Sequence, residues 1–342
     1  MTPRVWDIIG KRWIGYTLSM LIIIPGVVAL TYNMRTGRGA LNWGVDFTGG
    51  NYFQLRLERP FEVADVRPVV DRFATGESII QKSGQEVLVR TRPLDAEQKR
   101  GLIEEFKQRF GRITVLREDE VGPKIGQELR NIAIAAVIVG LLLQVVYISF
   151  RFRSIRYALT ADAALLHDIL VVVGVFAMTR KEVNSSFVAV LLTVVGYSIN
   201  DTIVVFDRIR ENLAMRTRET FDRLVNRSLL EALVRSINTS LTTILAIAAV
   251  YFFGGSTIRD FAFGLMMGIA TGTYSSVFNA SALLVDWHLW ADRRARRAGA
   301  AESVAAARVV PEPSPVRVPG GSVGAGARAA GGNQRRRKSK RR

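Results

Sequence analysis

The stretch VNSSFVAVLLTVVGYSINDTIVVF, residues 183–206, decides the fold of this chain. It is almost wholly apolar and long enough to cross a bilayer core of about 30 Å as one helix. Near its end it carries Asp201, with apolar residues on both sides. An ionisable residue inside a membrane span costs about 2.5 kcal/mol or more, so it marks a functional site by default.

Five further apolar stretches are each long enough to span a membrane. They cover residues 13–32, 132–150, 155–178, 236–253 and 261–290. The first is not followed by a small-x-small cleavage site and a polar mature start, so we expect a permanent span and not a signal peptide. The sequence therefore predicts a polytopic α-helical membrane protein with six transmembrane helices.

Lys and Arg residues predict the orientation of these spans. They gather before the first span, between the second and third, between the fourth and fifth, and after the sixth. These positions fall on one side of the membrane, and short loops rich in Lys and Arg face the cytoplasm. We therefore expect both termini in the cytoplasm.

Most of the formal net charge of +17 lies at the C-terminal end. Residues 293–342 contribute +12, and they include a Pro-rich and a Gly/Ala-rich stretch before a final basic run. We expect a disordered cytoplasmic tail that contacts anionic lipid or ribosomal RNA, or simply stays solvated, and no specific nucleic acid partner.

Residues 33–125, between the first two spans, form a stretch long enough to fold by itself. Patterns of period two and 3.6 predict strand 51–58, helix 61–73, strands 78–82 and 86–91, helix 96–110 and strand 113–117. Asp95 and Gly111 are the expected caps of the second helix. This order is that of a ferredoxin-like α+β domain, which we place on the extracytoplasmic face.

The remaining divisions follow from these assignments. Residues 1–32 hold the cytoplasmic N-terminus and the first span, and 126–292 hold the other five. Within the latter, 208–234 is expected to form a cytoplasmic linker helix, either on the membrane surface or solvated.

Asp201 and Arg235 are the main candidates for function. Desolvation favours the neutral carboxyl, so that Asp201 can take up and release a proton near neutral pH. Arg235 begins the fifth span, which is antiparallel to the fourth, so it either meets Asp201 or snorkels to the interface. Asn200 and Thr202 flank Asp201, and Asn238 lies one turn from Arg235 as the best candidate for a direct contact.

The third span also contains polar groups. His167 and Asp168 extend a proton path or make structural hydrogen bonds inside the bundle, and the sequence does not separate these alternatives. In the sixth span Gly264, Gly268 and Gly272 recur every four residues, which predicts a close helix-packing face. Cys is absent and only two His are present, so we expect no metal site. The sequence has neither a phosphate loop nor a nucleophile–base set, so we do not expect an enzyme.

Three motifs carry a family resemblance. They are GVDFTGG at residues 44–50, VGPKIG at 121–126, and GYSINDTIVVFDRIRE at 196–211. The chain resembles the SecD/SecF family of protein-export membrane proteins, within the resistance-nodulation-division superfamily, over residues 1–295.

The resemblance implies a role in protein export across the bacterial inner membrane. SecD, SecYEG, SecA, YajC, YidC, membrane lipids and the preprotein are the implied partners, and protons are the implied coupling ion, with no other cofactor. Asp201 matches the family's proton-carrying carboxylate and Arg235 its partner, with His167, Asp168, Asn200, Thr202 and Asn238 in support. The resemblance implies structural roles for Gly44, Asp46, Gly49, Gly50, Gly122 and Pro123. It also implies half of a pseudo-symmetric twelve-span unit, which does not transport alone.

Two other hypotheses remain open at this point. A proton-driven exporter of small molecules or lipids in the same superfamily usually has two large outer loops and twelve spans in one chain, which disfavours it here. A membrane scaffold without transport has no need for a buried Asp201, so its neutralisation is then harmless.

Overall fold

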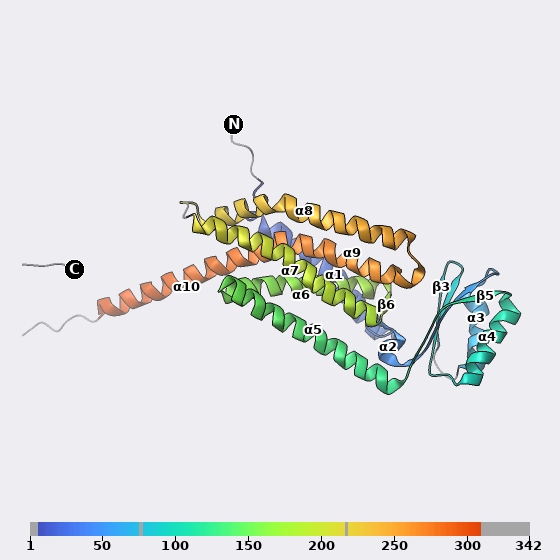
Figure 1. The fold of residues 1–342 in the computed structure, drawn as a ribbon. Coiled ribbons are helices and arrows are strands. Elements are labelled where there is room, and N and C mark those ends of the chain that lie inside the picture. Colours follow the sequence, from blue (N-terminus) through green and yellow to red (C-terminus); the bar gives the residue numbers. More distant parts are fainter. Residues whose placement is uncertain (1–5, 75–77, 216–217, 309–342) are drawn as a thin grey trace, which may run out of the picture. The chain divides into compact units, whose positions relative to one another are not determined.

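The computed structural model describes residues 6–74, 78–215 and 218–308 (Figure 1). In this part of the chain six helical segments are long and apolar enough to cross a membrane, which confirms the predicted spans. Five of them are α1 (Arg12–Arg35), α5 (Pro123–Phe152), α6 (Ile155–Thr179), α7 (Ser185–Ala214) and α8 (Phe221–Phe253). The sixth consists of α9 (Ser256–Ser275), a π-helical turn η1 (Ser276–Ala280) and the start of α10 (Ser281–Arg308).

Three of these helical segments form the centre of the bundle. In α6, in α7 and in the sixth span that includes α9, 56%, 50% and 50% of the spanning window is buried inside the chain, against 17% in α1, 6% in α5 and 11% in α8. Helix α9 packs against α6, α7 and α8, so any polar group that α6, α7 and α9 turn toward one another is held away from lipid.

The glycine face predicted for the sixth span packs against α7, as expected. A methyl group built on Gly268 would lie 2.1 Å from Cγ2 of Val194, and one on Gly272 would lie 2.9 Å from Cβ of Ser198. Gly264 likewise faces Val190 and Phe176. These small residues let the backbones of α7 and α9 approach closely.

Replacing Gly268 by alanine should therefore weaken the bundle. The added methyl group forces the stiff Val194 side chain or the helix to move, at a cost of about 1–3 kcal/mol. Gly196→Ala, on α7, is the matched control because nothing lies within 4 Å of its added methyl group. Thermal unfolding in detergent should separate the two variants, and equal melting temperatures would contradict this packing argument.

The segment between α1 and α5 folds as predicted. It contains β2 (Gly50–Leu57), α3 (Val63–Phe73), β3 (Ile79–Ser83), β4 (Glu86–Thr91), α4 (Ala96–Phe110) and β5 (Ile113–Val121). The sheet order is β3-β4-β2-β5 with every neighbouring pair antiparallel, which is the ferredoxin-like arrangement. One face of the sheet buries its apolar side chains against α3 and α4 (Figure 1). Asp95 caps α4 through a capping box and Gly111 ends it, as the sequence predicts.

Short elements connect this domain to the membrane helices. Strand β1 (Asn42–Trp43) follows α1 and pairs in parallel with β6 (Glu182–Val183), which lies between α6 and α7. Helix α2 (Val45–Thr48) then leads into β2 and packs on α5.

Two expectations about the segments predicted to lie in the cytoplasm are wrong. The predicted linker helix 208–234 is not a separate element, because α7 continues to Ala214 and α8 already begins at Phe221. Leu224, Val225 and Leu229 pack into the bundle core, so their apolar stripe extends a membrane helix and does not lie along the surface. Helix α10 continues to Arg308, so the segment 293–342 is helical at its start. Its Ala-rich composition favours a helix there, and residues 309–342 lie outside the described part.

Candidate functional site: buried carboxylates between the central spans

Asp201 lies on α7 at the meeting point of three helices. The residue is 2% exposed, with the buried Val205 and Phe206 one turn further along. From α8, the Ser240 hydroxyl donates to Oδ2 of Asp201 at 3.1 Å. From α9, the Thr273 hydroxyl donates to Oγ of Ser240 at 2.6 Å. Asp201 is therefore linked to both neighbouring helices by a short chain of hydroxyl groups.

The structure places Ser240, and not Asn238, against Asp201. Ser236 and Ser240 are buried one turn apart on the same face of α8, whereas Asn238 is exposed because it lies on the opposite face. Asn200 is exposed for the same reason on α7, while Thr202 is buried and donates to the carbonyl oxygen of Ser198 at 3.3 Å.

Arg235 does not form an ion pair with Asp201. Its side chain is exposed, and within the described residues no Asp or Glu oxygen lies within 4.0 Å of its guanidinium. Arg235 lies five residues before Ser240 on α8, which turns the two side chains to different faces of the helix. The proposed partnership of Arg235 with Asp201 stays a prediction.

A second carboxylate, Asp168 on α6, is 0% exposed. Its Oδ2 accepts hydrogen bonds from the Ser198 hydroxyl on α7 at 2.6 Å and from the Ser275 hydroxyl on α9 at 2.7 Å. Its Oδ1 lies 3.0 Å from Nδ1 of His167. This cluster ties the three central helices together at one level.

The residues that hold the two carboxylates were not singled out from the sequence. Ser198, Ser240, Thr273 and Ser275 are small hydroxyl residues in membrane spans, and Ser240, Thr273 and Ser275 have other hydroxyl residues close by in the sequence, most of which bond only to their own helix. Their spacing shows no pattern that points to a carboxylate on another helix. Only the packing of α6, α7, α8 and α9 brings these hydroxyls to Asp168 and Asp201.

The motif residues at 44–50 and 121–126 form a joint between the outer domain and the bundle. Gly49 and Gly50 have φ angles of 74° and 121°, which side chains other than glycine rarely adopt. Gly122 precedes α5 as its N-cap, Pro123 is the first residue of that helix, and a methyl group on Gly49 would lie 2.7 Å from Cα of Pro123. The structure therefore gives these glycines and this proline a place where backbone segments approach closely.

Asp46 and Gly44 belong to the same joint. Gly44 is the N-cap of α2, and Oδ2 of Asp46 accepts a hydrogen bond from the backbone N–H of Ser185 at 2.7 Å. Ser185 is the first residue of α7, where unpaired N–H groups and the helix dipole favour a negative charge. The motif is thus connected directly to the helix that carries Asp201.

A buried ion pair completes the joint. Nη2 of Arg90 on β4 lies 2.9 Å from Oε2 of Glu182 on β6, and both side chains are almost inaccessible to water. Arg90 also donates to Oδ1 of Asn42 at 2.7 Å. Burial raises the pKa of the Glu182 carboxyl, and the nearby Arg90 and Arg117 oppose that shift.

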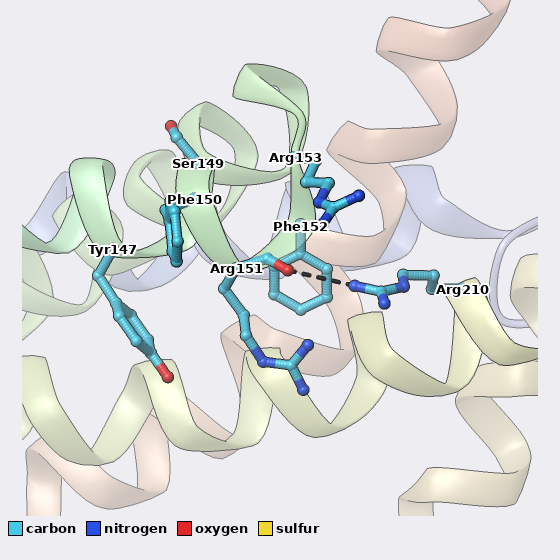
Figure 2. A pocket seen from close by; sticks show the side chains of 7 residues that line it. All are labelled: Tyr147, Ser149, Phe150, Arg151, Phe152, Arg153 and Arg210. Atoms are coloured by element: carbon cyan, nitrogen blue, oxygen red, sulfur yellow. Dashed lines mark hydrogen bonds between the residues drawn. The ribbon is translucent and has the colours of Figure 1, made fainter.

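A pocket lined by Arg151, Arg153 and Arg210 lies between the last turns of α5 and the facing part of α7 (Figure 2). Nη2 of Arg151 lies 2.8 Å from Oδ2 of Asp207, and Arg210 donates to the carbonyl oxygen of Arg151 at 3.2 Å. Tyr147 and Phe150 line the pocket beside these arginines. Arginines beside aromatic rings are typical of the boundary between membrane and water.

Within the residues that the structure describes, no group of three or more His, Cys, Asp or Glu side chains is placed to hold a metal ion. Six spans, one ferredoxin-like domain and carboxylates buried between the central helices define a polytopic membrane transport protein. The chemistry such a site offers is the binding and release of protons by a carboxyl group.

Comparisons with known proteins identify the family. Residues 102–290 match the family described as "Protein export membrane protein SecD/SecF, C-terminal", and residues 40–60 match the "SecD/SecF GG Motif". The protein translocase subunit SecF of Thermobaculum terrenum is 44% identical over 302 residues, which cover 82% of this chain and 93% of that protein. The chain belongs to the SecD/SecF family, within its SecF subunits, and is a component of the protein-export machinery.

A longer relative matches this chain over only about a third of its own length. The protein translocase subunit SecDF of Thermus thermophilus is 42% identical over 254 residues, which are 72% of this chain but 34% of that protein. The crystal structure of SecDF, described as a translocon-associated membrane protein, matches with a TM-score of 0.76 at 38% identity. The match covers 84% of this chain and 39% of the SecDF chain.

Proposed function

We propose that this chain uses the proton-motive force, together with SecD, to promote a late step of preprotein translocation that does not need SecA or ATP. Asp201 binds and releases the proton in this proposal. The chain then acts as a transport component and not as an enzyme, with protons as the coupling ion and no further cofactor.

The observation that carries the proposal is the position of Asp201. A carboxyl group that is 2% exposed inside a membrane helix costs free energy, so its presence there indicates a functional role. Its Oδ2 accepts a hydrogen bond from Ser240 on α8, and Thr273 on α9 donates in turn to Ser240. Protonation of this group therefore changes its interactions with α8 and α9, and such a change can be transmitted along α7 to Asp46 and the joint.

The proposed partners and location follow from the family. We infer that the chain works beside SecD at the SecYEG channel, in contact with YajC and YidC, in the bacterial inner membrane with both termini in the cytoplasm. The arginines that line the pocket in Figure 2 support this orientation, because membrane proteins carry an excess of Lys and Arg on the cytoplasmic side.

The test uses inverted membrane vesicles that contain a precursor trapped partway through the channel. SecD is present, ATP is removed and a proton gradient is applied. With Asp201→Asn, completion of translocation should fall to the rate seen without a gradient, because the amide cannot carry a proton. Insertion and initial ATP-driven translocation should be normal.

Asp207→Asn is the matched control on the same helix. The side chain of Asp207 is 38% exposed and that of Arg151 is 40% exposed, so their ion pair is open to water and contributes about 0–1 kcal/mol. This variant should respond to the gradient like the unmodified chain. Normal gradient-driven completion with Asp201→Asn would refute a proton role for Asp201 and favour a structural role beside SecD.

A further inference from the structure

Asp168 is buried more deeply than Asp201 and is better provided with donors. Asp168 is 0% exposed. Its Oδ2 accepts hydrogen bonds from two serine hydroxyls, and its Oδ1 lies within hydrogen-bond distance of a ring nitrogen of His167. Two or three donors favour the charged form of a carboxylate, whereas full burial favours the neutral form. Asp168 is thus held between opposing effects at the centre of the bundle.

His167 gives this cluster an open position. When Nδ1 carries the hydrogen and donates to Asp168, Nε2 is left as an acceptor. Nε2 is buried and has no hydrogen-bond partner in the described structure, and the side chain is 9% exposed. A buried acceptor without a donor costs free energy, so its retention indicates a group that a proton or a water molecule visits.

The cluster lies next to the Asp201 site along two helices. On α7, Ser198 comes three residues before Asp201, a rise of about 4.5 Å. On α9, Ser275 contacts Asp168, and Thr273, two residues earlier, contacts the Ser240 that bonds to Asp201. The π-helical turn Ser276–Ala280 begins directly after Ser275, and such turns frequently occur at functional sites.

We propose that Asp168 and His167 form a second proton-binding site that exchanges protons with Asp201. Helix α7 begins at the outer domain, so Ser198 and Asp168 lie nearer the outer face than Asp201 does. A proton that enters from outside then reaches this site first. The inference rests on the proposed function, since it presupposes that Asp201 carries protons.

The transfer step is balanced in atoms and charge. Nε2 of His167 takes up a proton, and the imidazolium gives its Nδ1 proton to Oδ1 of Asp168. The products are a neutral imidazole protonated at Nε2 and a neutral carboxyl group. His167 is in this step the relay and Asp168 the group that stores the proton.

Few other ionisable groups face the cluster. Tyr274 on α9 has its ring centroid 6.1 Å from that of His167, and its hydroxyl donates to the carbonyl oxygen of Gly15. Helix α7 contributes Asp201, and α1 contributes Tyr16, whose hydroxyl donates to Asp286. The central part of α5, residues 131–146, has no ionisable side chain. Apart from its burial, the protonation of Asp168 is therefore governed mainly by His167 and the two serines.

Infrared difference spectra of the full chain in liposomes test the site directly. Between about pH 5 and pH 8, the range in which an unperturbed imidazole changes charge, the spectra should show two carboxyl bands that appear reversibly on acidification. Asp168→Asn should remove one band and Asp201→Asn the other. An Asp168 band that is absent at every pH in this range would overturn the proposal.

Serine variants guard against loss of folding. Ser275→Ala removes one donor to Asp168 and should move the pH at which its band appears. Ser276→Ala is the matched control, because its hydroxyl is equally buried but donates to the carbonyl oxygen of Thr273. A purely structural Asp168 predicts no titration in either variant.

The relay has its own test in gradient-driven completion with SecD present. His167→Gln should slow completion severalfold and leave the Asp168 band in place, whereas His288→Gln should change neither the rate of completion nor the band. Normal completion with His167→Gln would overturn the relay. The proposed function has a separate test. Normal completion of translocation with Asp201→Asn would refute it, whether or not the Asp168 band is present.

Discussion

Gly50→Ala is expected to destabilise the outer domain by about 3 kcal/mol or more, since the strain of the backbone and a direct clash add together. Gly50 has a φ angle of 121°, and a methyl group on it would lie 2.2 Å from the carbonyl oxygen of Thr91. Thr91 ends β4, which is paired with β2, so its backbone cannot move away without breaking the ladder. Amide hydrogen exchange in β2 and β4 of the full chain should rise accordingly.

Gly84→Ala provides the comparison in the same domain. Gly84 also has a positive φ angle, 63°, but nothing lies within 4 Å of its added methyl group. Only the backbone strain of about 1–2 kcal/mol then remains. Equal exchange rates in the two variants would show that the close approach at Gly50 is not what requires glycine.

The fold was predictable from the sequence because its signals are local. Six long apolar stretches and alternating strands of the outer domain follow from residue spacing, and the sheet order follows from the βαββαβ sequence of elements. The prediction of a separate linker helix was wrong because periodicity shows an apolar stripe at Leu224, Val225 and Leu229 but does not show what this stripe packs against. That surface includes Ile9, which precedes α1, and Leu284 of α10, so it is assembled from segments far apart in the sequence.

The site was predictable only in its carboxylates. A charged residue in an apolar span is conspicuous, so Asp201 and Asp168 stand out by themselves. Their donors do not, because a serine that faces a carboxylate and one that faces its own backbone have the same sequence surroundings. The sequence favours Asn238 over Ser240 because an amide has more hydrogen-bonding groups, but Asn238 lies on the exposed face of α8.

The joint between the domain and the spans is the other feature that depends on tertiary packing. The side chain of Asp46 bonds to the first residue of α7, and β6 at the end of the preceding connection bonds to β1 and Arg90. A shift of α7 on protonation of Asp201 would therefore act on the outer domain through contacts at a single place. The strength of that joint decides how much of the shift reaches the domain.

Arg90→Met should weaken the joint strongly, because it leaves Glu182 buried without its partner. Breaking a buried ion pair by removing one member costs about 3–5 kcal/mol. The exposed pair between Arg72 and Glu105 in the same domain is the control, and Arg72→Met should cost about 0–1 kcal/mol. Hydrogen exchange of the Gly44 amide, which donates to the carbonyl oxygen of Val183 at 2.8 Å, reports on the joint directly.

Combining Arg90→Met with Glu182→Leu separates the loss of an ion pair from the stranding of a charge. The double variant should recover much of the lost protection, because an apolar pair of similar volume often replaces a buried ion pair at little cost. If Arg90→Met alone exchanges no faster than Arg72→Met, the pair does not hold the joint together. In that case Asp46 and the β1–β6 pairing must carry the connection between α7 and the outer domain.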